Sequence, residues 1–379
     1  MSNRTVVMFS PTITSGHTLY VRSLIEVLIS NGQEVVHLTS KGFRSEDYPP
    51  VPTLDILRPL RRRENYSNRL FWILGRITHY SVRDIHFMFW LRRNRKSVQL
   101  VHLQEYSAWT LGPLAIWCHI SGIPIVITIH NIEAHDAYVS YRRIEGHIRK
   151  MSLHFVDHIY VHKGINPVSV NMRVTNRPDK VTFIRHGVWE SAPTVTQRSN
   201  RTLLLLGSIR RNKGIIQLLT AAKDLKEWNF TIAGACEDRS LDLEIKSKLP
   251  DNVIYSPHFL EEAELKSLLA VSTACVLPYT EEFKAQSGVL HLAIGHGVPV
   301  IVTPNDALVD IVDEFGCGVI AGGFGSCDIA NAIRSLEDPD IYSRILDGVD
   351  FARSELTWDR SAKATLQSYG RLATSKKRS

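Results

Sequence analysis

The sequence predicts an α/β protein made of two doubly wound domains with parallel sheets. Short apolar runs alternate with amphipathic stretches along the whole chain, which is the pattern of strands followed by crossover helices. Two apolar runs in the second half lead into turns that contain glycine and polar or cationic residues. The length of 379 residues exceeds one ordinary α/β domain and suits two, each with its own core.

The first half is expected to form one sheet with helices between its strands. A helix over Leu19–Ser30 should end at Asn31-Gly32, a plausible C-cap, and a second helix should span Trp109–His119. The expected strands are Val6–Phe9, Val35–Leu38, Leu54–Leu57, Val98–His102, Ile125–Ile129, Asp157–Val161 and Val181–Ile184.

The second half repeats this pattern. The expected strands are Leu203–Leu206, Phe230–Ile232, Val253–Tyr255, Ala274–Leu277, Val300–Val302 and Gly318–Ile320, with helices over Ile215–Lys226, Glu261–Val271 and Ala330–Leu336. The polar segment Gly187–Asn200 contains Pro193 and is the best linker candidate. We therefore expect a first domain over residues 1–187, a second over 188–357, and a tail over 358–379 whose helix can pack back on the first domain.

Composition and targeting signals indicate an ordinary globular protein. Hydrophobic residues make up 44% and charged residues 22% of the chain, both typical values. No uninterrupted apolar run reaches the roughly 18 residues that a membrane span needs, and the N-terminus lacks a signal-peptide layout. These features predict a cytoplasmic protein.

The stretch Arg58–Lys96 carries an uneven charge. It holds eleven basic residues against two acids, with aromatic residues interleaved at helical spacing. One interpretation is a surface that meets anionic lipid headgroups at the inner face of the cell membrane. The other is a normal helix with its aromatics in the core and its arginines in water. No nucleic-acid-binding module accompanies the charge, so nucleic acid is not expected as a partner.

The two glycine turns predict a cradle for a diphosphate. Gly207–Gly214 and the segment Gln286–Ile294 each lead into a helix start, where backbone N–H groups and the helix dipole favour an anion. Cations complete such a cradle, and Lys213 with one of Arg210 or Arg211 fits that role. The other interpretation of the two arginines is that they are solvated loop charges.

These features resemble the GT-B glycosyltransferases, most closely the retaining enzymes of glycosyltransferase family 4. The resemblance rests on Ser15-Gly16, on Thr128–Asp136, on Gly207–Gly214, and on Gln286–Ala293 followed by Gly297-Val298-Pro299. It implies two Rossmann-like domains facing a central cleft, the first binding the acceptor and the second a nucleoside-diphosphate sugar. Many members carry two glutamates eight positions apart around the donor helix, where this chain has Lys284 and Leu292.

The resemblance also implies roles for individual residues. His130 ends an apolar strand and would lie near the reacting sugar, although it could instead be a buried histidine bonded to backbone. The expected catalytic residues are His130, Arg210 and Lys213. The expected donor-binding residues are Gly16, Arg211, Phe259, Glu282, Gln286, Ser287, Gly288 and Val289. The expected acceptor-binding residues are Asn131 and His135.

No metal or other cofactor is expected. Asp338-Pro339-Asp340 has the letters of a metal-binding acidic pair, but its late polar context indicates a turn. The sequence thus predicts a hexosyltransferase that uses a UDP- or GDP-linked sugar and a lipid-linked or saccharide acceptor. A GT-B-type epimerase or phosphorylase and a non-catalytic nucleotide-sugar binding protein remain alternatives, although no lysine-linked pyridoxal site is apparent.

Overall fold

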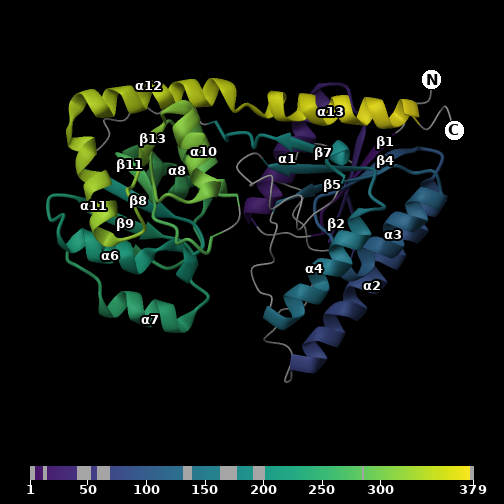
Figure 1. Cartoon of the computed structure of the whole chain (residues 1–379), viewed down its shortest axis with the longest axis horizontal. Helices are drawn as coiled ribbons and strands as arrows, with labels where there is room; N and C mark the ends of the chain where they lie inside the picture. Colours follow the sequence, from purple (N-terminus) through teal and green to yellow (C-terminus); the bar gives the residue numbers. More distant parts are fainter. Residues whose placement is uncertain are drawn as a thin grey trace. The chain divides into compact units, whose positions relative to one another are not determined.

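The computed structural model describes residues 5–11, 15–40, 53–57, 69–130, 139–162, 177–190, 201–283 and 286–375. Internal contacts divide the chain into two compact units, which we describe separately. Unit 1 comprises Met1–His162, Asn166–Arg185 and Trp358–Ser379, and unit 2 comprises Lys163–Ile165 and His186–Thr357. Each unit is a parallel α/β layer structure (Figure 1).

Unit 1 contains a seven-stranded parallel sheet in the order β3-β2-β1-β4-β5-β6-β7. Its strands are β1 (Thr5–Phe9), β2 (Val35–Ser40), β3 (Thr53–Leu57), β4 (Val98–Leu103), β5 (Ile125–Ile129), β6 (His158–His162) and β7 (Val181–Ile184). The seven strands expected from the sequence are therefore all present, with bounds shifted by two residues at most. All strands are parallel, but the order in which the chain adds them reverses between β1 and β4: β2 and β3 lie on one side, and β4 to β7 on the other. Doubly wound proteins bind ligands at the carboxyl ends of the strands at such a reversal point.

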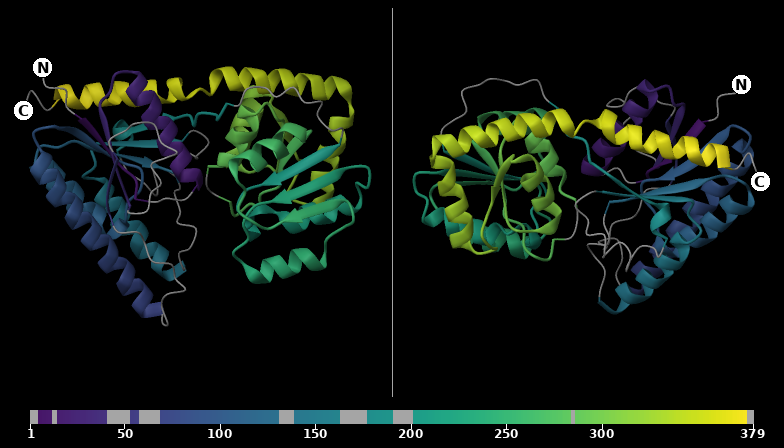
Figure 2. Two further views of the ribbon diagram at one scale, coloured as in Figure 1. Left: turned by 180° about the vertical axis from the view of Figure 1, so that it is seen from behind. Right: turned by 45° about the horizontal axis from the view of Figure 1, so that its top comes forward.

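Five helices of the described part of the chain cover this sheet. They are α1 (Ser15–Ser30), α2 (Arg69–Asn94), α3 (Ala108–Ile120), α4 (Val139–Leu153) and α13 (Trp358–Ser375). Helices α2, α3 and α4 lie together on one face, while α1 packs against α13 on the other (Figures 1 and 2). The C-terminal helix α13 thus belongs to unit 1 and contacts β4 and β7. Helix α4 is absent from the expectations above.

Unit 2 contains a six-stranded parallel sheet in the order β10-β9-β8-β11-β12-β13. The strands are β8 (Thr202–Leu206), β9 (Asn229–Ala233), β10 (Val253–Ser256), β11 (Ala274–Leu277), β12 (Val300–Val302) and β13 (Gly318–Ile320). All six were expected, three of them with identical bounds. The reversal point here lies between β8 and β11, and their carboxyl ends carry the two glycine turns.

The helices of unit 2 correct several expectations. They are α6 (Ile215–Lys223), α7 (Arg239–Ser247), α8 (Glu262–Val271), α9 (Gly288–Gly295), α10 (Asp306–Phe315), α11 (Ser326–Arg334) and α12 (Pro339–Glu355).

The prediction of a turn at Asp338-Pro339-Asp340 is wrong, because this segment forms the start of α12. Asp338 is the N-cap, and its carboxylate accepts hydrogen bonds from the N–H groups of Asp340 and Ile341. Of the helices that the structure describes, none has the length and apolarity needed to cross a bilayer.

Candidate functional site

The two glycine turns of unit 2 come together at the carboxyl ends of β8 and β11. A Cβ atom placed on Gly207 would lie 3.0 Å from Val289 in the first turn of α9. Gly207 has a φ of 99°, a backbone conformation that only glycine adopts readily. After it, a 3-10 turn at Arg211–Lys213 leads into α6. The fold therefore joins two segments that lie about 80 residues apart in the sequence, as a diphosphate cradle requires.

Gly214 closes the first turn under tight steric limits. Its φ is 65°, and a Cβ atom there would overlap the carbonyl oxygen of Pro278 at 1.7 Å. Any other residue would push the turn away from the end of β11. This contact explains why the turn needs glycine directly after Lys213, and it fixes Lys213 beside the loop that precedes α9.

Lys213 points into a box of two aromatic rings. Its Nζ lies 3.6 Å from the ring centroid of Tyr279 and 4.6 Å from that of Phe283. Burial, and secondarily the positive charge of Arg210, lowers the pKa of Lys213 to about 7. Ring faces attract a cation but carry no negative charge, and no described carboxylate lies within ion-pair distance of the Lys213 ammonium. Tyr279 and Phe283 are candidate site residues that the sequence analysis missed, although two aromatics four positions apart just before the donor helix are a visible signal.

The start of α9 supplies the N–H donors of the cradle. Ser287 is its N-cap, with Oγ 3.0 Å from the Tyr279 hydroxyl and 3.3 Å from the N–H of Leu290. The Ser287 side chain is thus engaged in capping. Within the part of the chain that the structure describes, no group accepts a hydrogen bond from the N–H of Gly288 or Val289. These two donors lie at the N-terminal end of α9, where the positive end of the helix dipole favours an anion.

The structure separates the two candidate arginines. Arg211 bonds to side chains at the start of α7, with donor–acceptor distances of 3.2 Å to Asp238, 3.1 Å to Glu244 and 2.7 Å to Ser240. Arg210 is exposed and, among the described residues, has no carboxylate within ion-pair distance. Arg210 is therefore the better candidate for the diphosphate.

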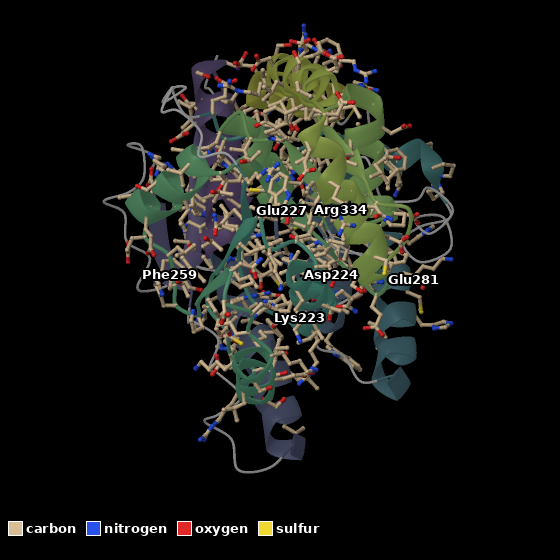
Figure 3. The ribbon with its side chains drawn as sticks, turned by 90° about the vertical axis from the view of Figure 1, so that its left-hand side faces the viewer. Lys223, Asp224, Glu227, Phe259, Glu281 and Arg334 are labelled. Atoms are coloured by element: carbon tan, nitrogen blue, oxygen red, sulfur yellow. The ribbon has the colours of Figure 1, made fainter. Side chains whose placement is uncertain are left out.

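The other donor candidates are more scattered. Glu282 is exposed in the turn before α9, and Gln286 is half-buried next to the N-cap. Phe259 is 60% exposed beyond the end of β10. Figure 3 shows Phe259 and Glu281 on opposite sides of unit 2 in its view. Phe259 therefore stands apart from the acidic loop before α9.

In unit 1, His130 follows directly after β5. Its Nε2 lies 3.0 Å from Gln104 Oε1, and its ring makes edge contacts with the rings of Tyr20 and His17 of α1. It bonds to a side chain, rather than only to backbone as the alternative interpretation proposed.

The other predicted residues of unit 1 give less information. Gly16 was expected in a loop before the first helix, but α1 begins at Ser15, so Gly16 lies in its first turn. Asn131 and His135 lie outside the described residues. Among the described residues, no group of three His, Cys, Asp or Glu side chains is placed to hold a metal ion.

Comparison with known proteins identifies the family. The family "Glycosyl transferases group 1" matches residues 200–338, which include both glycine turns. The match thus covers the part of unit 2 that forms the cradle, and it agrees with the resemblance expected from the sequence. It is 23% identical over 261 residues to a GDP-mannose:glycolipid 4-beta-D-mannosyltransferase of Xanthomonas campestris pv. campestris, a match that covers 67% of this chain and 70% of the relative.

Solved structures of glycosyltransferases share the fold. Sucrose-phosphate synthase from Thermosynechococcus elongatus superposes with a TM-score of 0.75 at 17% identity, covering 98% of this chain and 100% of that one. Anabaena HepE in complex with UDP-glucose gives a TM-score of 0.71 at 14% identity, covering 96% and 99%. At this identity the likeness establishes the GT-B fold alone, which confirms the fold expected from the sequence.

Proposed function

We propose that this group 1 glycosyltransferase moves a hexosyl group from a UDP- or GDP-linked sugar, with retention of configuration, to a lipid-linked saccharide in cell-surface polysaccharide synthesis. The cradle of unit 2 carries this proposal. It contains Lys213, Arg210 and two N–H donors, and fixed donors and cations of this kind would stabilise the charge that develops on a departing nucleoside diphosphate.

The donor proposal is tested by incubating the pure protein with a panel of nucleotide sugars. GDP-mannose comes first because the Xanthomonas relative is named for it, and UDP-glucose second because HepE was solved with it. Slow hydrolysis to nucleoside diphosphate and free sugar supports a transferase. Appearance of an epimeric nucleotide sugar supports the epimerase, and binding without any turnover supports a non-catalytic binding protein. The anomeric proton coupling of a product glycoside reports retention or inversion.

The proposed acceptor and membrane partner rest on α2 and on the Xanthomonas relative, whose name specifies a glycolipid. Leu74, Ile85 and Phe89 of α2 are exposed, the last by 59%. The one acid of α2, Asp84, is buried in an ion pair with Arg83 at 2.7 Å. The exposed charges near its C-terminal end are all basic: Arg92, Arg93, Arg95 and Lys96. An apolar and basic helix face is typical of docking on anionic lipid. The part of the expected surface before Arg69 lies outside the described residues.

Vesicle flotation tests the membrane partner. We expect the protein to float with phosphatidylglycerol vesicles at low salt and to detach at high salt, because exposed charges are screened beyond about 8 Å at physiological ionic strength. The double variant Arg92→Glu, Arg93→Glu should lose most of this binding. A matched charge reversal on unit 2, Lys223→Glu with Lys226→Glu, should not (Figure 3 labels Lys223). Equal flotation of both variants would make α2 an ordinary solvated helix and would favour a water-borne acceptor.

A further inference from the structure

Unit 1 contains three buried polar side chains that connect the C-terminal helix to His130, which is half-buried. Tyr369 of α13 lies with its hydroxyl 2.5 Å from Nδ1 of His102 on β4. Nε2 of His102 lies 3.1 Å from the amide nitrogen of Gln104, whose Oε1 is 3.0 Å from Nε2 of His130. The exposed fractions of His102, Gln104 and Tyr369 are 0%, 2% and 1%.

This chain ends at the point in the sheet where a ligand is expected. Gln104 follows β4 directly, and its backbone N–H donates to the carbonyl of Phe9 at the end of β1 at 2.9 Å. It therefore lies between the carboxyl ends of the two strands that flank the reversal point of the sheet. Burying polar groups is costly unless they are bonded, and each of the three buried residues makes a side-chain hydrogen bond within this chain.

The partners of Gln104 fix its orientation and the protons around it. Its amide nitrogen is 3.3 Å from Met8 Sδ, which can only accept, so the carbonyl oxygen faces His130. Burial lowers the pKa of His102 to about 3, so this ring is neutral and has one donor and one acceptor nitrogen. Its Nε2 accepts from Gln104 and also lies 2.7 Å from the hydroxyl of Thr128, which can donate to the same nitrogen. Its Nδ1–H then donates to the oxygen of Tyr369. At the other end, a carbonyl oxygen opposite Nε2 of His130 requires that Nε2 carry the proton.

We propose that Gln104 is a positioning residue that holds His130 in the Nε2–H tautomer, and that α13 supports it through Tyr369 and His102. The ring nitrogen Nδ1 of His130 then carries the lone pair and can act only as an acceptor. The hydrogen bond made by one imidazole nitrogen sets the role of the other, so Gln104 determines what His130 can recognise. The inference rests on the proposed function for its effect on turnover, but the tautomer itself is a property of the protein without substrate.

Nuclear magnetic resonance of histidine-labelled protein tests the tautomer directly. Long-range ¹H–¹⁵N spectra should show a protonated Nε2 and an unprotonated Nδ1 for His130, whose signals the variant His130→Asn identifies by their loss. Gln104→Leu removes the acceptor and should average or reverse this pattern. Gln99→Leu is the matched control on the same strand, because Gln99 bonds only to the side chain of Gln33 among the described residues, and it should leave the pattern unchanged. A wild-type His130 protonated at Nδ1 would overturn the proposal.

Turnover gives a second readout. Gln104→Leu should lower kcat/KM about tenfold, as loss of an orienting partner commonly does. Gln104→Glu keeps an acceptor opposite Nε2 and should retain the tautomer, while its negative charge shifts the pH profile of His130 upward. Among the described residues, the titratable side chains whose rings contact His130 are His17 and Tyr20 of α1 and His162 of β6, and they are unchanged in this variant.

The two readouts separate the possible failures. If no nucleotide sugar turns over, the proposed function fails while the spectra still decide the tautomer. If Gln104→Leu does not fold, Gln104→Glu and Tyr369→Phe carry the test, and the latter should weaken kcat/KM less than Gln104→Leu does. An unshifted pH profile in Gln104→Glu, with normal folding, would show that Gln104 only fills space.

Discussion

The two units share one sheet topology but carry opposite chemistry at corresponding places. In unit 2 the carboxyl ends of β8 and β11 hold a cation and N–H donors that no described side chain neutralises. In unit 1 the carboxyl ends of β1, β4 and β5 hold neutral, mutually bonded side chains. Burial lowers all three pKa values, that of His37 to about 4, that of His102 to about 3 and that of Lys213 to about 7, so near neutral pH the two histidines are uncharged while a bound anion can still protonate the lysine. The fold therefore supplies the position of a site, and the residues after each strand decide whether it suits an anion or uncharged hydroxyls.

The contrast between the two units requires that turnover depend on the Lys213 side chain of unit 2. Lys213→Ala should lower turnover about a hundredfold or more, because removing one preorganised group that stabilises developing charge commonly has that effect. Steady-state kinetics with the donor measures it, and circular dichroism checks folding. Lys223→Ala, at the exposed end of α6, is the control and should keep the wild-type rate. A folded Lys213→Ala protein with normal turnover would remove the cradle from the mechanism.

Proton uptake sharpens the same contrast. In the donor-free protein the pKa of Lys213 is about 7, so above this pH the side chain is mostly neutral. A diphosphate beside it favours the ammonium form, and donor binding must then take up a proton. The donor Kd should rise by up to about tenfold per pH unit above 7 and be flat below it.

Calorimetry in buffers of different ionisation enthalpy measures this uptake. The observed heat should depend on the buffer at pH 8 and much less at pH 6. Lys213→Arg is the matched control, since arginine stays charged throughout and takes up no proton on binding. Buffer-independent heats for the wild type at pH 8 would mean that Lys213 is already charged before the donor arrives.

The arginine pair should show a smaller effect. Arg210→Ala should raise the donor Kd about tenfold, because a charged hydrogen bond to phosphate is lost. Arg211→Ala should change it by less than about twofold, since its exposed ion pairs with Asp238 and Glu244 contribute little. Titration calorimetry of both variants with the nucleoside diphosphate decides the matter. The reverse ranking would mean that Arg211 exchanges its carboxylate partners for the donor.

The sequence predicted unit 2 better than the site in unit 1, and the reason is locality. A glycine turn, a lysine and a helix start are neighbours in sequence, so the Lys213 turn could be read directly. The Tyr369–His102 bond joins residues 267 positions apart, and only the fold brings them together. In the sequence, the position of Gln104 directly after a buried strand is the signal that could have indicated the Tyr369–His102–Gln104 chain.

The helices missed in unit 2 could have been read from their caps. Helices α7, α10 and α12 follow Asp238, Asn305 and Asp338, and each side chain accepts a hydrogen bond from a first-turn N–H. At Asp338-Pro339-Asp340 the proline was taken as a turn residue, whereas it occupies the first helical position that proline favours. Aspartate, asparagine and proline occur in both turns and helix starts, and the amphipathic run that follows distinguishes the two.

The smallest expected effect is that of removing divalent cations. In the proposed reaction Lys213, Arg210 and the N–H groups of Gly288 and Val289 already face the diphosphate, which is the role a bridging metal has in other transferases. Asp338, the best acidic candidate in the sequence, uses its carboxylate to cap α12. We therefore expect a chelator to change the rate less than about twofold, against the much larger effect of Lys213→Ala. Activity that disappears in chelator and returns with manganese would mean that the cations of unit 2 do not suffice, and it would weaken the contrast between the two units.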